Sequence, residues 1–362
     1  MITHDMIKRC PKVELHDHLD GGLRPQTIID LASEEGITLP ETDPVKLQKW
    51  IVRGGEEKSL ALYLESFALT TQVMQSEYAL ERIAFEAIED LAAENVVYAE
   101  IRFAPEIHTQ KGLNLEQIVT SVLKGLERGR KKTGVQYGLI LCAMRNQSPE
   151  NSLEIAELAV AFSERGVVGF DIAGDEYGHP PKKHIEAFRY IRNKNFNITI
   201  HAGEAFGCES IWQAIQICGA HRIGHGVRLI EDMVTEGTKI EKMGSLAHFV
   251  QDRRIPMEMC LTSNVGTGAV KSYQDHPFPI FFKNNFRVFL CTDNRLMSNT
   301  TLTKEMEIAV KEYNLTFRDL EKLTINAMKS AFIHHNDKIA IIYDIIKKQY
   351  AELRAEYNID VQ

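Results

Sequence analysis

The chain has 362 residues, 44% of them hydrophobic and 25% charged, which is the composition of an ordinary globular protein and excludes a disordered or fibrous one. Its 42 Lys and Arg against 50 Asp and Glu leave a formal charge of -8 without a basic block, which argues against nucleic acid or an acidic membrane as a partner. No apolar run is long enough to span a membrane, and the N-terminus carries no apolar signal stretch. The six cysteines show no Cys-x-x-Cys spacing and indicate buried free thiols in a reducing compartment. We therefore expect a cytoplasmic protein.

Short apolar runs rich in β-branched residues recur between longer amphipathic stretches, a pattern typical of repeated strand and helix units. Eight such runs are predicted as strands, at 13–18, 97–103, 137–144, 168–173, 198–201, 222–225, 256–261 and 288–292. Eight strand–helix units predict a closed (β/α)8 TIM barrel. We expect a single domain spanning 1–362.

The segment at about 23–95, between the first two strands, is predicted as a helical insertion over the barrel mouth. It holds a charged, glycine-containing loop at 52–58 and helical patterns at 59–74 and 77–94. The face with Tyr63, Leu64 and Phe67 either lines an apolar pocket at the mouth or is ordinary core packing. Three further helical patterns follow the last strand, at 302–313, 316–332 and 337–356.

Four metal-capable side chains stand at the ends of predicted strands that are far apart in the sequence. His16 and His18 are two residues apart on one strand, so their imidazoles point to the same side. His201 ends the fifth strand and Asp293 follows the eighth. Because catalytic groups of such barrels lie at the C-terminal strand ends, these four residues are expected to converge. Three imidazoles and a carboxylate suit zinc, although iron, cobalt and manganese accept the same ligands.

Two further residues have chemistry that fits a hydrolase. Zinc lowers the pKa of a bound water toward about 7, and hydroxide attack on a substrate then needs a group that moves protons. Glu204, just past His201, is the predicted proton shuttle; the alternative is a helix N-terminal acid. His225 is either a second metal ligand or a catalytic group. Because the fourth strand region, 168–175, contains no lysine to bridge two metals, we expect one metal.

Seven motifs carry a resemblance to the adenosine deaminase family of the metal-dependent amidohydrolase superfamily. The resemblance covers the chain from Lys12 to about Phe332. The motifs lie at 14–22, 98–105, 141–145, 170–176, 199–204, 222–226 and 291–294. It implies zinc-dependent conversion of adenosine and 2'-deoxyadenosine to inosine and deoxyinosine, with release of ammonia, in purine salvage.

The resemblance also implies roles for individual residues. His16, His18, His201 and Asp293 match the ligands of one zinc ion per subunit, and His18 is also counted with the substrate contacts. Glu204 matches the acid that protonates purine N1, and His225 the residue that orients the attacking hydroxide, with Asp293 assisting. Asp20 matches the ribose-binding carboxylate, and Gly174 a glycine whose backbone N–H meets purine N3.

One position departs from the common family pattern. Many members carry two adjacent acids after the last strand, the second contacting purine N7, whereas this chain has Asp293 followed by Asn294. An amide can donate to an unprotonated N7, so purine binding is retained. The Asn variant is similar to a bacterial branch of the family.

Other functions remain open at this point. Deaminases of adenine or of modified adenosines such as aminofutalosine share these motifs, and a catalytically silent nucleoside-binding protein is the non-enzyme alternative. AMP is disfavoured, because only Arg24, Arg102 and Arg145 lie near the motifs. The sequence leaves the oligomeric state open and points to a small-molecule purine as the partner.

Overall fold

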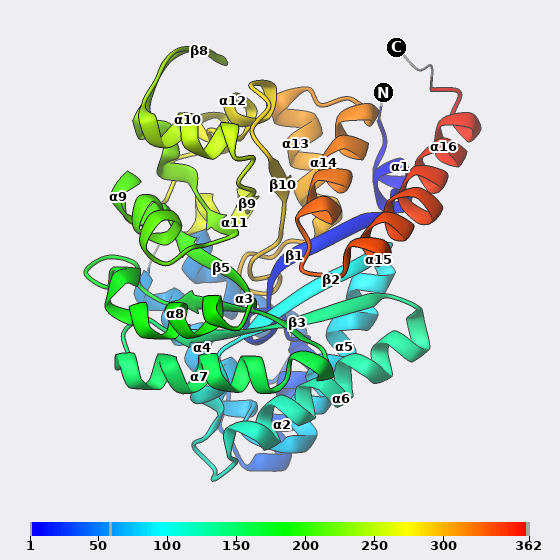
Figure 1. The fold of residues 1–362 in the computed structure, drawn as a ribbon. Helices are drawn as coiled ribbons and strands as arrows, with labels where there is room; N and C mark the ends of the chain where they lie inside the picture. The colour runs from blue at the N-terminus through cyan, green and yellow to red at the C-terminus, as the bar shows by residue number, and fades with distance from the viewer. Residues whose placement is uncertain (1, 58–59, 360–362) are drawn as a thin grey trace.

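Eight parallel strands form the centre of the molecule, and helices surround them (Figure 1). The computed structural model describes residues 2–57 and 60–359; the side chains of Leu60, Ala61, Tyr63 and Leu64 lie outside this description. The strand order is β1-β2-β3-β4-β5-β6-β9-β10, and a parallel bridge between Asp17 and Asp293 joins the last strand to the first. The predicted (β/α)8 barrel is therefore confirmed. The strands are β1 Lys12–His18, β2 Val96–Phe103, β3 Gln136–Met144, β4 Val167–Ala173, β5 Asn197–Ala202, β6 Arg222–His225, β9 Met257–Met259 and β10 Val288–Leu290.

The strands follow the predicted apolar runs because both faces of each barrel strand are buried. In β1, for example, every residue from Lys12 to Asp17 is buried. The ends differ by a residue or two in most strands. The larger difference is at β9, which stops at Met259 because helix α11 (Leu261–Gly266) begins two residues later.

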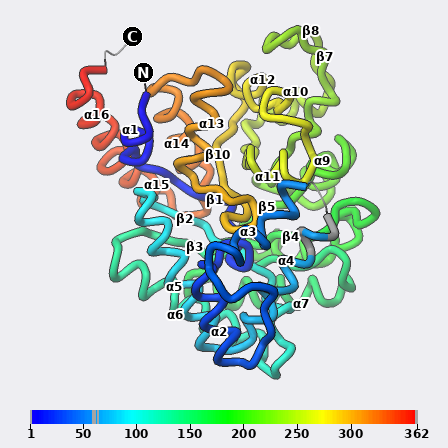
Figure 2. Tube along the Cα trace, turned by 180° about the vertical axis from the view of Figure 1, so that it is seen from behind, coloured from blue at the N-terminus to red at the C-terminus, as the bar shows by residue number. Residues whose placement is uncertain are grey.

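Four helices fill the interval between β1 and β2: α2 (Pro25–Glu35), α3 (Pro44–Glu56), α4 (Leu60–Val73) and α5 (Glu77–Ala93). Seen from behind, α2 lies below the strands, with α3 above it (Figure 2). The loop expected at 52–58 is wrong for residues 52–56, because α3 continues through Gly54 and Gly55. The packing explains the difference: a Cβ added to Gly266 of α11 would lie 3.4 Å from the Cα of Gly55, so the glycine allows close helix contact that offsets its poor helix propensity.

The other helices cover the outside of the barrel and its ends. They are α1 His4–Arg9, α6 Leu115–Thr133, α7 Pro149–Ala161, α8 Ile185–Asn193, α9 Cys208–Trp212, α10 Ser245–Asp252, α12 Phe278–Lys283, α13 Leu302–Tyr313, α14 Phe317–Ser330, α15 His335–Ala340 and α16 Lys347–Glu356. The predicted C-terminal helices are present, with a π-helical turn between α15 and α16. Arg9 pairs with Glu356 at 2.6 Å, which ties the first helix to the last. Both chain ends lie on that side (Figure 1).

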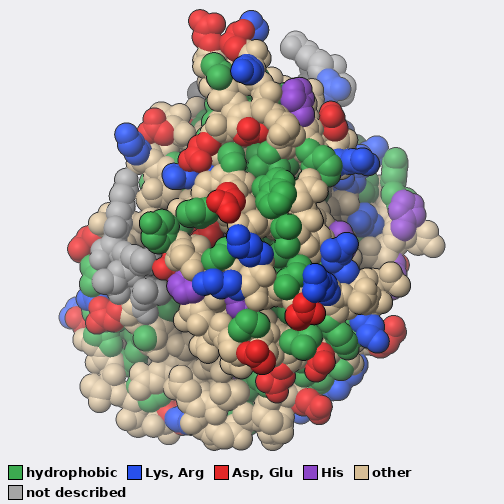
Figure 3. Space-filling view, turned by 60° about the vertical axis from the view of Figure 1, so that its left-hand side comes forward, with side chains coloured by type: hydrophobic (Ala, Val, Ile, Leu, Met, Phe, Trp, Pro, Cys, Tyr) green, Lys and Arg blue, Asp and Glu red, His purple; other side chains and the backbone are tan. Residues whose placement is uncertain are grey.

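A two-stranded antiparallel hairpin, β7 (Met233–Glu236) and β8 (Lys239–Met243), was not predicted and projects from the barrel in both views (Figures 1 and 2). On the face in Figure 3, acidic and basic side chains are interspersed around a band of hydrophobic ones. Within the described parts of the chain, no helix is both long and apolar enough to cross a membrane.

Candidate active site

Four metal-capable side chains from three different strand ends lie together at the C-terminal mouth of the barrel. His16 and His18 come from β1, His201 from β5, and Asp293 follows β10. One ligand atom from each lies within 4.8 Å of the others. Burial lowers the pKa of His18 well below its ordinary value, which keeps this ring neutral. The donor set therefore consists of imidazole nitrogens and one carboxylate.

The spacing of these ligand atoms would suit one metal ion. Nε2 of His201 lies 3.0 Å from Nε2 of His16 and 3.1 Å from Nε2 of His18. Oδ1 of Asp293 lies 3.2 Å from Nε2 of His16 and 3.4 Å from Nε2 of His18. Ligands at about 2.0–2.1 Å from a tetrahedral zinc are separated by about 3.3 Å. The four side chains are thus spaced as zinc ligands are.

The protonation of the His16 and His201 rings also fits a bound metal ion. Nδ1 of His16 lies 2.6 Å from Glu258, and Nδ1 of His201 lies 2.9 Å from Asp171. Each carboxylate draws the ring proton onto Nδ1, which leaves a lone pair on Nε2. Two lone pairs would then face each other across 3.0 Å. This contact is repulsive unless a cation lies between the rings, so the residues fit a bound metal.

A buried ion network inside the barrel holds these two carboxylates. Arg102 donates to Asp171 at 2.8 Å and to Glu258 at 2.9 Å, and Arg222 donates to Glu258 at 2.6 Å. Burial opposes ionisation of Glu258, but the two guanidinium groups outweigh it and hold the pKa of its carboxyl well below the usual range. The pKa of Asp171 is lowered against the same burial by His201 and Arg102. Both carboxylates therefore remain charged acceptors behind His201 and His16.

Two residues of the site have backbone conformations that side chains rarely adopt. His225 at the end of β6 has φ +63°, and Asp293 has φ +62°. Non-glycine residues in this region are strained and concentrate at functional sites. Asp293 is further fixed by Ser263, whose Oγ donates to Oδ2 at 2.6 Å and leaves Oδ1 facing the imidazoles. Oδ2 is therefore occupied by the hydroxyl of Ser263 while Oδ1 remains the atom for the metal.

Glu204 lies beside the ligand cluster in the loop after β5. Oε1 accepts hydrogen bonds from Thr267 Oγ1 at 2.9 Å and Asn264 Nδ2 at 3.4 Å. Oε2 lies 3.5 Å from Nε2 of His225. The carboxyl group is therefore anchored through one oxygen, while the other faces His225.

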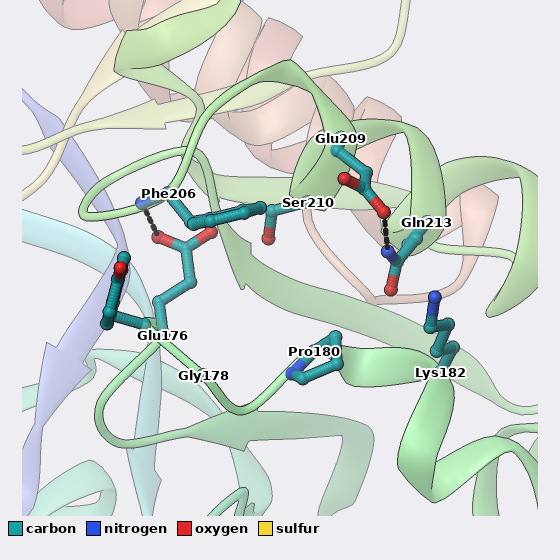
Figure 4. Close-up of a pocket in the computed structure, with 9 residues that line it drawn as sticks. Glu176, Gly178, Pro180, Lys182, Phe206, Glu209, Ser210 and Gln213 are labelled. Atoms are coloured by element: carbon teal, nitrogen blue, oxygen red, sulfur yellow. Dashed lines mark hydrogen bonds between the residues drawn. The ribbon is translucent and has the colours of Figure 1, made fainter.

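The backbone of that loop is held by another acid, Glu176. Backbone N–H groups of Gly203, Glu204, Ala205 and Phe206 donate to its carboxylate at 2.6–3.0 Å. Figure 4 shows the Glu176 side chain pointing up to this loop, with the bond to Phe206 dashed. Glu176 separates the ligand cluster's cavity from a smaller one of about 310 Å³, shown in Figure 4, into which Ser210 and Gln213 point.

The cavity over the ligand cluster has a volume of about 730 Å³ and is lined by most of the predicted substrate contacts. Asp20, Phe67, Gly174 and Asn294 all line it. Oδ1 of Asp20 is buried with no hydrogen-bond partner in the described part of the chain, and burial raises the pKa of this carboxyl to about 6. Gly174 has φ +99°, which a side chain would strain. The predicted contacts of Tyr63 and Leu64 lie outside the described residues.

The sequence patterns did not identify several of these polar residues. Asp171 and Glu176 were inside a recognised motif but had no role, and Glu258 is the single charge within the apolar strand β9. A charged residue within an apolar barrel strand is rarely buried without a partner, and this pattern could have identified Glu258. Asn264 and Thr267 follow β9 and gave no signal, since their partners are 39 and 63 residues away in sequence.

The barrel and its cluster of imidazoles and a carboxylate define a metal-dependent hydrolase of the amidohydrolase class. The family model for adenosine deaminase matches residues 11–348, so the chain belongs to the adenosine deaminase family of hydrolytic deaminases. Over 359 residues it is 50% identical to adenosine deaminase 1 of Streptomyces coelicolor, covering 98% of this chain and 90% of the relative.

Two solved structures extend this comparison. An adenine deaminase from Arthrobacter aurescens has a TM-score of 0.84 and 26% identity, covering 95% of this chain and 98% of its own. Arabidopsis ADAL in complex with IMP has a TM-score of 0.82 and 26% identity, covering 96% of this chain and 99% of its own. The family is thus clear from sequence and fold together.

Proposed function

We propose that this protein converts adenosine and 2'-deoxyadenosine to inosine and deoxyinosine, with release of ammonia. The observation that carries the proposal is the position of Glu204, with Oε2 3.5 Å from His225 and beside the ligand cluster at the base of the 730 Å³ cavity. A proton donor and a metal site adjoining one cavity suit hydrolysis at a ring carbon. The nearly full-length identity of 50% to an adenosine deaminase supports the same reaction.

Zinc is the metal we propose for the site, with His16, His18, His201 and Asp293 as its ligands. The nitrogen-rich donor set supports this choice over magnesium or calcium. When bound, such an ion polarises a water molecule so that it is nucleophilic at neutral pH. Asp171 and Glu258 keep His201 and His16 in the tautomer that offers Nε2.

The chain's own residues supply the remaining steps. Glu204 gives a proton to purine N1, which makes C6 electrophilic, while His225 holds the attacking oxygen. A C6–O bond forms as water gives up one proton, which replaces the proton lost by Glu204. The remaining proton on that oxygen passes to the amino group, the C6–N bond breaks, and ammonia leaves with C6=O in the product. Because the polar groups are fixed before substrate enters, they stabilise the developing charge with little reorganisation.

Binding contacts account for a nucleoside. Asp20, whose Oδ1 has no hydrogen-bond partner among the described residues, accepts a ribose hydroxyl. The Gly174 N–H donates to N3, and the Asn294 amide donates to N7. A Cβ added to Gly21 would lie 2.1 Å from Oδ1 of Asn294, so this oxygen packs on the Gly21 backbone and leaves the amide nitrogen for the purine.

The charges around the cavity disfavour a nucleotide. Five acids line it, Asp20, Asp175, Glu176, Glu204 and Asp293, and Arg228 is the one Lys or Arg among the described lining residues. A phosphate would therefore meet net negative charge. The predicted cytoplasmic location, which rests on the cysteine pattern, stays a prediction.

The proposal is tested by adding adenosine, 2'-deoxyadenosine, adenine and AMP separately to zinc-replete protein and following the ultraviolet spectrum and released ammonia. The expected result is rapid conversion of the two nucleosides. Faster turnover of adenine would replace the proposal with a free-base deaminase, and faster turnover of AMP would overturn the argument from charge. Zinc-loaded protein that binds adenosine without converting it would identify a silent binding protein.

A further inference from the structure

Glu176 makes more hydrogen bonds to the loop after β5 than any other side chain described there. Its Oε1 accepts from the N–H of Gly203 at 2.6 Å, and its Oε2 from those of Glu204, Ala205 and Phe206 at 3.0, 2.7 and 3.0 Å. Four consecutive N–H groups that converge on one carboxylate form a concave cradle for an anion. Here the anion is the carboxylate of Glu176, a residue of the same chain.

The cradle depends on the local backbone. Gly203 has φ +74°, and a Cβ at this position would lie 2.5 Å from the Ile211 side chain, so the turn requires glycine. The four N–H groups precede α9, which begins at Cys208. They therefore do not donate to carbonyl groups of that helix. Without Glu176 they would need water or another acceptor, in a place that is buried at Gly203 and partly buried at the other three N–H groups.

Burial makes this interaction strong. The Glu176 residue is 6% exposed, and its carboxylate accepts one N–H group at Oε1 and three at Oε2. Hydrogen bonds to an ionised acceptor are stronger than those between neutral groups. Glu176 is therefore a fixed anchor for the segment between His201 and α9.

We infer that Glu176 is a positioning residue that fixes the proposed proton donor Glu204 by binding its backbone from behind. The Glu204 carboxyl is held at its outer end by Thr267 at 2.9 Å, and the Glu204 N–H is held by Glu176 at 3.0 Å. The two acids have different roles: Glu176 accepts four backbone N–H groups and holds the loop, while Glu204 keeps Oε2 for the substrate. This inference rests on the proposed role of Glu204.

The test compares Glu176→Gln with Glu209→Gln as a matched control. An amide has one acceptor oxygen and places an NH2 group against backbone donors, so part of the cradle is lost. Glu209 is an exposed acid at the start of α9 whose Oε1 accepts only from Gln213 among the described contacts, at 2.9 Å. Both changes remove one negative charge from the lining of the same 310 Å³ cavity.

Two readouts distinguish positioning from general stability. Hydrogen exchange measured by mass spectrometry should rise about tenfold or more for the amides of 203–206 in Glu176→Gln, with the rest of the chain and the zinc content unchanged. On adenosine, kcat should fall about 10²-fold while KM changes less than about threefold, because a misplaced proton donor is felt in the transition state. Glu209→Gln should match the wild type in both.

Glu176→Asp keeps the charge on a shorter side chain and should recover part of the lost kcat; it also serves if Glu176→Gln fails to fold. Unchanged kcat in both variants would overturn the inference, as would faster exchange throughout the protein. If the wild type does not deaminate adenosine, the proposed function fails, but the exchange result still reports whether Glu176 holds the loop. The two failures are therefore distinguishable.

Discussion

The side-chain amide of Asn264 lies 3.1 Å from Nδ1 of His225, and this contact sets the tautomer of the histidine. The assignment begins at Phe278, whose backbone N–H donates to Nδ1 of His276 at 3.1 Å. Nε2 of His276 must then donate to Oδ1 of Asn264 at 3.2 Å, which turns the Asn264 NH2 toward His225. His225 therefore accepts at Nδ1 and carries its proton on Nε2, the atom that faces Glu204.

Replacing Asn264 by Asp should disrupt this tautomer. A carboxylate cannot donate to Nδ1, so it draws the His225 proton there, away from the substrate side. We expect kcat on adenosine to fall by about 10²-fold, within the range for loss of an oriented catalytic group. Nitrogen-15 NMR of the imidazoles checks the tautomer directly. His276→Gln keeps a donor for Asn264 and should retain most activity; an unaltered His225 spectrum in Asn264→Asp would contradict the assignment.

Asp171→Asn should weaken zinc binding without removing a ligand. The amide can no longer attract the Nδ1 proton of His201 as an anion does, so Nε2 becomes a poorer donor. Loss of such a partner lowers metal affinity about 10–100-fold. Competition with a zinc chelator measures this change, and unfolding of the metal-free proteins separates it from lost stability. Equal zinc affinity in variant and wild type would be evidence against the proposed role.

Because His108 is buried, we expect the folded protein to lose stability in mild acid. The His108 side chain lies in the turn after β2, with Nδ1 3.1 Å from the Met74 carbonyl, and burial lowers its pKa to about 4. The unfolded chain takes up this proton near pH 6.5, so stability present at pH 7 is lost as pH falls from 6.5 to 4, by about 3 kcal/mol.

The measurement for His108 is the free energy of unfolding in urea at pH 7 and pH 4.5, on metal-free protein so that zinc release does not contribute. His108→Gln keeps a donor for Met74 and cannot titrate, so its free energy should change less between the two pH values. Identical pH dependence in the two proteins would show that His108 titrates normally in the folded state.

Asn294 should make the protein sensitive to the atom at purine position 7. An analogue with carbon in place of N7 cannot accept the Asn294 amide proton, so wild-type kcat/KM should fall by about 10–100-fold, the cost of about 1.5–3 kcal/mol for an unpaired buried donor. In Asn294→Ala the two substrates should differ little. A double-mutant cycle over both substrates measures the coupling, and a coupling near zero would place N7 elsewhere.

Much of the barrel was predictable because its signals are local. An apolar run between amphipathic stretches marks a buried strand wherever it is placed, and all eight runs are strands. The α3 helix was missed at Gly54 and Gly55 because the contact that stabilises it lies on α11, which no local pattern connects to α3. The β7–β8 hairpin has alternating, mostly exposed residues and so lacked the apolar run that marked the others.

The candidate site also contains residues that could be predicted from the sequence and residues that could not. The end of a barrel strand can be read from sequence, so the position of His16, His18, His201 and Asp293 at one mouth follows from topology. The groups that tune them depend on pairs that only the closed barrel brings together, such as Arg102 with Asp171, 69 residues apart, and Arg102 with Glu258, 156 residues apart. Charge type alone does not select such partners.

The most direct measurement is the rate of ammonia release from adenosine by wild-type protein and Glu204→Gln, with zinc content determined on the same samples. The Gln side chain keeps the shape and an acceptor for Thr267 but has no acidic proton for N1. The proposal predicts equal zinc content and a kcat at least about 10²-fold lower in the variant. A zinc-replete Glu204→Gln protein with wild-type turnover would contradict it.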